Sequence, residues 1–184
     1  RLETAVSGDP RLVAYFRHRS LTGRDLPENL GFAEREPYHE DGKPTVFLPA
    51  MLAPVQDANG RVVCILRTYL DPRGPGKANV ASAKKMSHAI YRGASNGGAI
   101  RLREAGEILG IAEGIETAES VYQATGVPVW AAVSAGGMEK FMVPPELRGM
   151  IREIQIWADN DISGPGQLAA IRQAVRLHGE GIVM

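Results

Sequence analysis

The second half of the sequence alternates short apolar runs with helical segments, and this alternation constrains the fold more than any other feature. Strands that alternate with helices at this spacing form a parallel sheet with right-handed crossovers. The sequence therefore predicts an α/β sheet flanked by helices after Gly106. Apolar runs suited to buried strands occupy 108–112, 129–133 and 151–158, and helical spacing occupies 116–125 and 165–179.

The end of the chain carries the last elements of this pattern. Pro165 is suited to a first helical turn and Gly179 to a helix end. Between them, an apolar face is formed by Leu168, Ile171 and Val175. Residues 181–184 are expected to begin a fourth strand that the chain cuts short.

Three carboxylates follow the predicted strands. Glu113 comes directly after the first strand, and Asp159 and Asp161 come after the third. Ligands of open α/β sheets gather at the carboxyl ends of the strands, so these side chains are expected at one edge. Clustered carboxylate oxygens suit Mg²⁺ or Mn²⁺, and such an ion can neutralise a phosphate and orient an attacking oxygen. An exposed acidic loop is the alternative.

Glycines accompany the acids. Gly114 follows Glu113, and Ser163 and Gly164 precede the helix that begins at Pro165. Glycine lets the backbone approach a ligand closely, and the N–H groups of a helix N-terminus favour phosphate. Gly114, Ser163 and Gly164 are therefore candidate phosphate contacts.

Two segments resemble a known family. IAEGIET at 111–117 and WADNDISGPG at 157–166 are similar to the toprim domain of primases, topoisomerases and certain nucleases, above all in phage and plasmid primase-helicase proteins. The resemblance implies a Rossmann-like parallel sheet over 106–184, with Asp159 and Asp161 as metal ligands. It implies Glu113 as general acid or base or a further ligand, with Glu116 as an assisting acid.

The first half of the chain predicts a smaller α+β subdomain over 1–105. Asp9 can cap a helix over 10–19, and the sequence Asp57-Ala58-Asn59-Gly60 between two apolar runs is a strong hairpin signal. Strands are expected over 46–55 and 62–70, with short ones near 30–32 and 99–103. Residues 71–79 read as a loop and 83–100 as irregular.

Charge is distributed unevenly along the chain. Residues 1–100 hold 14 Lys and Arg against 10 Asp and Glu, whereas residues 101–184 hold 7 against 11. Between 61 and 92 the only acid is Asp71. A basic segment of this kind could hold a polyanion for metals in the acidic half to act on, although chance drift in charge is the simpler alternative.

The basic segment carries a second, looser resemblance. Residues 60–93 are similar in layout to the amino-terminal part of the bacterial primase core, where a hairpin and a lysine-bearing loop precede the toprim sheet. This resemblance implies contacts with template backbone or nucleoside triphosphate from Arg67, Lys77, Lys84 and Lys85.

Three functions remain open at this point. The first is primer synthesis on single-stranded DNA by a primase-type nucleotidyltransferase that uses Mg²⁺ or Mn²⁺, nucleoside triphosphates and a replicative helicase in the same or another chain. The second is a toprim nuclease that hydrolyses DNA, and the third is a non-catalytic module that binds nucleic acid or a helicase. One cysteine, no apolar run of membrane-spanning length and no signal peptide favour a cytoplasmic protein without a membrane partner. Arg1 at the first position suggests an excerpt from a longer protein.

Overall fold

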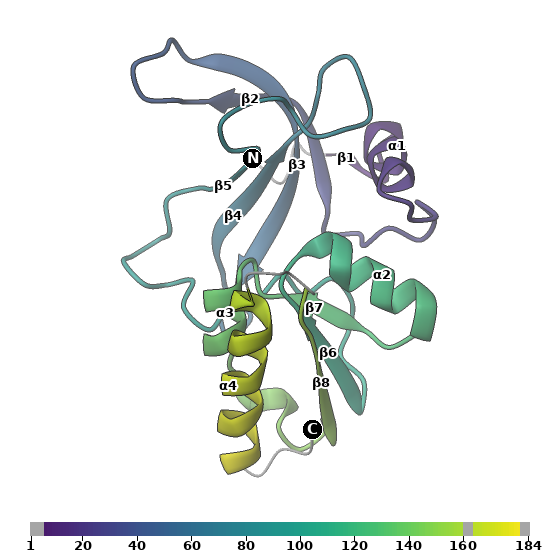
Figure 1. Cartoon of the computed structure of the whole chain (residues 1–184), viewed down its shortest axis with the longest axis vertical. Coiled ribbons are helices and arrows are strands. Elements are labelled where there is room, and N and C mark those ends of the chain that lie inside the picture. Colours follow the sequence, from purple (N-terminus) through teal and green to yellow (C-terminus); the bar gives the residue numbers. More distant parts are fainter. Residues whose placement is uncertain (1–5, 160–163, 181–184) are drawn as a thin grey trace. The chain divides into compact units, whose positions relative to one another are not determined.

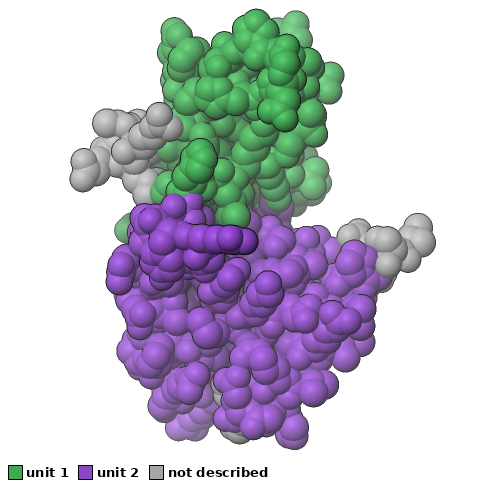
Figure 2. Space-filling view, turned by 90° about the vertical axis from the view of Figure 1, so that its left-hand side faces the viewer, with its two compact units in different colours: residues 1–54, 65–88 green, residues 55–64, 89–184 purple. Residues whose placement is uncertain are grey.

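The computed structural model describes residues 6–159 and 164–180 and divides the chain into two compact units. Unit 1 comprises residues 1–54 and 65–88, and unit 2 comprises residues 55–64 and 89–184 (Figure 2). The tip of one hairpin, residues 55–64, therefore belongs to unit 2 while the rest of that hairpin belongs to unit 1. A division at residue 106 remains a prediction from the sequence.

Unit 1 contains most of a five-stranded meander in which each strand pairs with the next one along the chain. Its order is β1 (Val6–Ser7), β2 (Gly31–Tyr38), β3 (Val46–Gln56), β4 (Val62–Tyr69) and β5 (Lys84–Met86). The strand expected near residues 30–32 is thus much longer. Its second half, with Glu34, Arg35, Glu36 and Pro37, has no apolar alternation that would reveal it.

One helix, α1 (Pro10–His18), accompanies this sheet and confirms the sequence prediction. Asp9 caps it, because its Oδ1 accepts a hydrogen bond of 2.7 Å from the N–H of Arg11. The buried side of α1 consists of Leu12, Tyr15 and Phe16.

The turn between β3 and β4 is the predicted hairpin. Gly60 has φ of +78°, a conformation that glycine adopts without strain, and its N–H donates to the carbonyl of Asp57 at 3.0 Å. The Asp57 carboxylate also accepts from the N–H groups of Asn59 and Arg61, at 2.9 and 3.0 Å. The guanidinium of Arg101 donates to the carbonyls of Asp57 and Ala58, at 3.0 and 3.2 Å, which fixes the turn within unit 2.

Two expectations for residues 83–103 were wrong. The stretch expected to be irregular contains β5, in which Lys85 pairs with Arg67 of β4. The strand expected over 99–103 is reduced to two isolated bridges, from Ala99 to Gln56 and from Ile100 to Ala131. Short edge pairings of this kind depend on a neighbouring strand, so local sequence reveals them poorly.

Unit 2 is a parallel sheet between two layers of helices (Figure 1). The central strand β6 (Ile108–Ala112) has the bounds that the sequence predicts, with β7 (Val129–Ala131) on one side and β8 (Glu153–Trp157) on the other. In Figure 1, α2 lies on one side of the sheet, and α3 and α4 lie on the other. The helices are α2 (Ile115–Thr125), α3 (Ala135–Lys140), the 3-10 helix η2 (Pro145–Leu147) and α4 (Pro165–Gly179).

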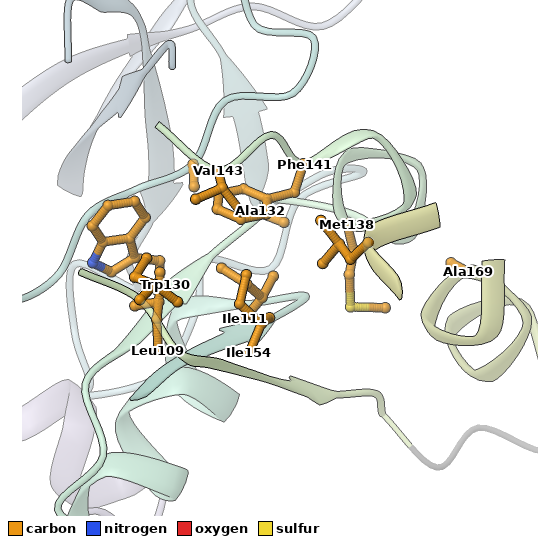
Figure 3. Close-up of a cluster of buried hydrophobic side chains, with 12 residues drawn as sticks. Leu109, Ile111, Trp130, Ala132, Met138, Phe141, Val143, Ile154 and Ala169 are labelled. Carbon is orange, nitrogen blue, oxygen red and sulfur yellow. The ribbon is translucent and has the colours of Figure 1, made fainter. Parts of the chain in front are cut away.

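The core of unit 2 lies between the sheet and the α3–α4 layer (Figure 3). Leu109, Ile111 and Ile154 from the strands meet Met138 of α3 and Ala169 of α4. All five side chains are less than 5% exposed, so water is excluded from this layer. This packing fixes the strands whose ends carry the predicted acids.

Helix α4 confirms its predicted bounds but turns its apolar stripe outward. Leu168, Ile171 and Val175 share one face, as predicted, and are 49%, 61% and 70% exposed. The buried face instead contains small residues, Leu177 and the polar Gln173, whose Nε2 donates to the carbonyl of Phe141 at 3.1 Å. The fourth strand predicted at 181–184 lies outside the described residues.

Candidate metal centre

Glu113 and Asp159 follow two neighbouring parallel strands. Glu113 comes directly after β6, and Asp159 comes two residues after β8. The strands pair in register up to Ala112 and Trp157, so they end at the same edge of the sheet. Both acids therefore lie at the carboxyl edge, where ligands of parallel sheets bind.

Gly166, in the first turn of α4, lies close to the Glu113 carboxylate and to the Asp159 backbone. A Cβ atom built on Gly166 would lie 3.5 Å from Glu113 Oε2 and 3.4 Å from the carbonyl oxygen of Asp159. Gly166 is itself buried, so the first turn of α4 packs against both residues.

Asp159 is held by a residue that the sequence did not single out. Thr117 Oγ1 donates a hydrogen bond of 2.8 Å to Asp159 Oδ1, although 42 positions separate the two residues. Thr117 lies in the first turn of α2, one turn after Glu113. The sequence does offer one signal, because Thr117 is the last residue of the segment IAEGIET, in which only the acids point directly to a metal.

The third predicted carboxylate, Asp161, and the candidate phosphate contact Ser163 lie outside the described residues. Within residues 6–159 and 164–180, no group of three or more His, Cys, Asp or Glu side chains is close enough to hold a metal. The described part of the site is thus a pair of acids. Glu116, the predicted assisting acid, lies in the first turn of α2 with intermediate exposure.

Two helices begin at this edge, and glycine precedes both. Gly114 is the N-cap of α2 in an extended conformation, and Gly164 is the N-cap of α4 with φ of +76°. Neither glycine can cap its helix with a side chain, so first-turn N–H groups remain for other acceptors. The positive ends of both helix dipoles therefore favour anions near the two acids.

Arg67, a predicted nucleic-acid contact, lies in unit 1 and is largely enclosed. Its Nη1 lies 3.4 Å from Glu36 Oε1, and the two side chains are 15% and 6% exposed. The guanidinium also donates to the carbonyl of Met86 at 3.4 Å and approaches the hydroxyl of Tyr69 at 3.5 Å. The positive charge of Arg67 is therefore directed at groups of its own sheet.

The three predicted lysine contacts also belong to unit 1. Lys85 donates to the carbonyl of His39, and its Nζ stands 4.3 Å from the ring centre of Tyr38. Lys77 follows the loop after β4, and Lys84 begins β5. All three side chains have intermediate exposure. Their role toward nucleic acid remains a prediction.

A buried ion pair anchors α2 within unit 2. Glu119 is fully buried and accepts a 3.0 Å hydrogen bond at Oε2 from Arg103 Nη2. The Arg103 guanidinium also lies 3.6 Å from the ring centre of Tyr122. The backbone carbonyl of Arg103 accepts a hydrogen bond of 2.7 Å from Trp130 Nε1. These contacts fix the helix that carries Thr117.

The chemistry of the described residues fits a divalent cation of the Mg²⁺ class. Carboxylate and carbonyl oxygens are the hard ligands that such ions prefer. Oxygens of Glu113 and of the Asp159 backbone both lie beside Gly166. The residues present are therefore compatible with the predicted metal.

Comparison with protein families covers almost the whole chain. Residues 4–102 match the family described as "Domain of unknown function (DUF7146)", and residues 108–184 match the family described as "Toprim domain". The chain belongs to the DUF7146 family, and its second part is a toprim domain. The resemblance drawn from IAEGIET and WADNDISGPG is thereby confirmed. No curated protein matches significantly.

Solved primase structures share the fold. The primase fragment of the bacteriophage T7 primase-helicase matches with a TM-score of 0.53 and 19% identity, over 84% of this chain and 59% of that one. A DNA primase domain from Pseudomonas aeruginosa gives 0.52 and 16%, over 88% and 57%. The Aquifex aeolicus primase (zinc-binding and RNA polymerase domains) gives 0.52 and 14%, over 99% and 55%.

These likenesses confirm the predicted fold class, a toprim sheet flanked by helices with an antiparallel sheet in the amino-terminal part. The chain spans less than two thirds of the length of each of these three structures. A search of the described helices finds none with the length and apolar character needed to span a bilayer.

Proposed function

We propose that this chain is part of the catalytic core of a DNA primase and takes part in primer synthesis on a single-stranded DNA template. The observation that carries the proposal is the placement of Glu113 and Asp159 at one carboxyl edge of the toprim sheet, where both lie beside Gly166 of α4. That edge suits metal-dependent nucleotidyl transfer, because it combines hard oxygen ligands with helix N-termini that favour phosphate.

In this proposal, Asp159, Asp161 and Glu113 hold Mg²⁺ or Mn²⁺. The ion, when bound, neutralises phosphate charge and orients the attacking oxygen. Glu113 is the candidate for accepting or returning a proton, since its carboxylate and the Asp159 backbone both lie beside Gly166. Gly114 and Gly164 let phosphate oxygens approach the first-turn N–H groups of α2 and α4.

The substrates follow from the same chemistry. Nucleoside triphosphates and single-stranded DNA both present phosphates, for which Lys77, Lys84 and Lys85 supply positive charge, with Arg67 as a fourth cation. The bacteriophage T7 structure with this fold is described as a primase-helicase protein. We therefore include a replicative helicase, in the same or another chain, among the proposed partners.

The test is a primer-synthesis assay with the variants Asp159→Ala and Glu113→Gln. Both should abolish nucleotide-dependent product while the circular dichroism spectrum and the melting temperature remain those of a folded protein. Glu153→Gln is a matched control, because Glu153 begins β8 at the opposite end of the strand from Asp159. Full activity of both site variants would refute the proposal.

The same assay separates the other two functions. Labelled single-stranded DNA that shortens with Mg²⁺ in the absence of nucleotides would identify a nuclease. Intact DNA binding without any measurable Mg²⁺ or Mn²⁺ binding would identify a non-catalytic module. New product that requires nucleotides is the result expected of a primase.

A further inference from the structure

A side-chain hydrogen bond from Thr117 joins α2 to the residue Asp159 just after β8. Its hydroxyl donates 2.8 Å to Asp159 Oδ1, and the bond is partly shielded from water. Within the described part of the chain, the second oxygen of Asp159, Oδ2, accepts no other hydrogen bond. One oxygen of the carboxylate is therefore fixed by Thr117.

The hydroxyl of Thr117 is itself held in place by the packing of α2. Thr117 lies in the first turn of a helix whose next turns bury Ala118, Glu119 and Val121. The ion pair between Glu119 and Arg103 holds that helix in place. A β-branched side chain on a packed helix has few rotamers, so the hydroxyl is held in one direction.

A carboxylate two residues beyond a strand end would otherwise rotate. Asp159 lies where the regular pairing of β8 has ended, so the sheet does not restrain its side chain. Hydrogen bonds from surrounding residues orient the carboxylates that hold metals, and their loss typically lowers metal affinity by about 10- to 100-fold.

We propose that Thr117 is a positioning residue for the metal centre, which presents Asp159 to the cation by fixing one of its two carboxylate oxygens. This inference rests on the proposed metal site at Glu113 and Asp159. It assigns Thr117 no contact with the metal or the substrate. The first turn of α4 limits the space on the other side, since Gly166 borders both acids.

The experiment measures Mn²⁺ affinity by electron paramagnetic resonance titration of the purified chain. Thr117→Val keeps the shape of threonine and removes the hydroxyl, and it should weaken Mn²⁺ binding by about 10- to 100-fold. Thr117→Ser restores the donor and should bind within about threefold of the wild type. Circular dichroism and thermal melting of each variant show whether the fold is retained.

Thr125→Val is the matched control. Thr125 lies in the last turn of the same helix, and its hydroxyl donates to the carbonyl of Val121 at 2.8 Å, away from the acids. This variant loses the same chemical group without touching Asp159, so its Mn²⁺ affinity should equal that of the wild type. Equal weakening in Thr117→Val and Thr125→Val would show a general effect on α2 and overturn the inference.

A double-mutant cycle with Asp159→Ala separates this inference from the proposed function. Because Thr117 acts through the Asp159 carboxylate, which alanine lacks, removing its hydroxyl in the Asp159→Ala background should lower affinity no further. If Asp159→Ala weakens Mn²⁺ binding but Thr117→Val binds as the wild type does, the metal site stands and the role of Thr117 is refuted. Absence of Mn²⁺ binding by the wild type would refute both.

Discussion

Charged residues have different surroundings in the two units. In unit 2, Glu113 and Asp159 lie beyond the ends of β6 and β8, at an edge where the sheet offers no cross-strand neighbour. In unit 1, Arg67 and Lys85 lie within paired strands, and both direct their charge at groups of the same unit. The acids lie beside the first turn of α4, whereas the cations meet Glu36 and the ring of Tyr38.

This contrast shows that position relative to a strand end says more about a charged residue than its charge does. A residue inside a strand has neighbours on both adjacent strands, at distances that favour pairing. A residue just beyond a strand end has lost those neighbours, so contacts from other elements orient it, as Thr117 of α2 does for Asp159. The acidic edge should therefore govern activity, and the paired cations should govern stability.

The largest effect is expected at the acidic edge. Asp159→Asn should lower primer synthesis by at least about 1,000-fold, because several kcal/mol of metal-based charge stabilisation is lost. Asn can still accept the hydrogen bond from Thr117, so the free energy of unfolding without metal should stay the same or rise. Primer-extension rates and urea denaturation measure the two quantities. A marked loss of stability would contradict the expectation that the acids govern activity while the paired cations govern stability.

Arg67→Ala should show the opposite pattern. It removes the ion pair between Arg67 and the buried Glu36, which should cost about 3 kcal/mol of unfolding free energy in urea denaturation. The double variant Arg67→Met/Glu36→Leu removes both charges of this pair and should recover much of that loss. If Arg67→Ala instead retained wild-type stability and lost DNA binding, Arg67 would be the phosphate contact that the sequence suggested.

A smaller effect is expected for Lys84→Ala. Removing one phosphate contact should weaken single-stranded DNA binding several-fold and reduce the slope of log affinity against log salt by roughly 0.7. Fluorescence anisotropy at several salt concentrations measures both. Lys43→Ala is the control, since exposed Lys43 pairs with Glu40 at 2.5 Å in the loop between β2 and β3. Equal salt slopes for both variants would argue against a specific role for Lys84.

The smallest effect is expected on the outer face of α4. Ile171→Gln should change the free energy of unfolding by less than about 0.5 kcal/mol, because the side chain is 61% exposed. Leu177→Ala, on the buried face, should cost about 2 to 5 kcal/mol. Thermal denaturation compares the two. A large loss in Ile171→Gln would mean that the stripe is covered in solution.

The sequence predicted unit 2 well because its signals are local. ILGIA is a continuous apolar run between turn residues, and Pro165 and Gly179 mark the ends of α4, so both elements have the expected bounds. The strand ends then follow, and with them the places of Glu113 and Asp159. The burial of α4 could not be read the same way, because small residues pack against the sheet while Leu168 and Ile171 face outward.

The sequence predicted unit 1 less well because its strands depend on their neighbours. Within unit 1, the strong local signal is that of the helix after Asp9, which is confirmed. The hairpin turn at Asn59-Gly60 is also confirmed, but it belongs to unit 2. Glu36 and Lys85 are charged residues inside strands, which sequence patterns assign to solvent. The hydrogen bond from Thr117 to Asp159 was equally hidden, since it joins residues 42 positions apart.

The order of the sheet in unit 2 also determines when the proposed metal site could form. Strand β8 lies beside β6 in the sheet, but β7 and α3 come between them in the chain. A growing or refolding chain can thus form β6, α2 and β7 while Asp159 is still undocked. Pairing between strands that are distant in the chain forms late in folding. Cation binding would therefore show that β8 has paired with β6. The bound cation would in turn stabilise the paired strand by mass action.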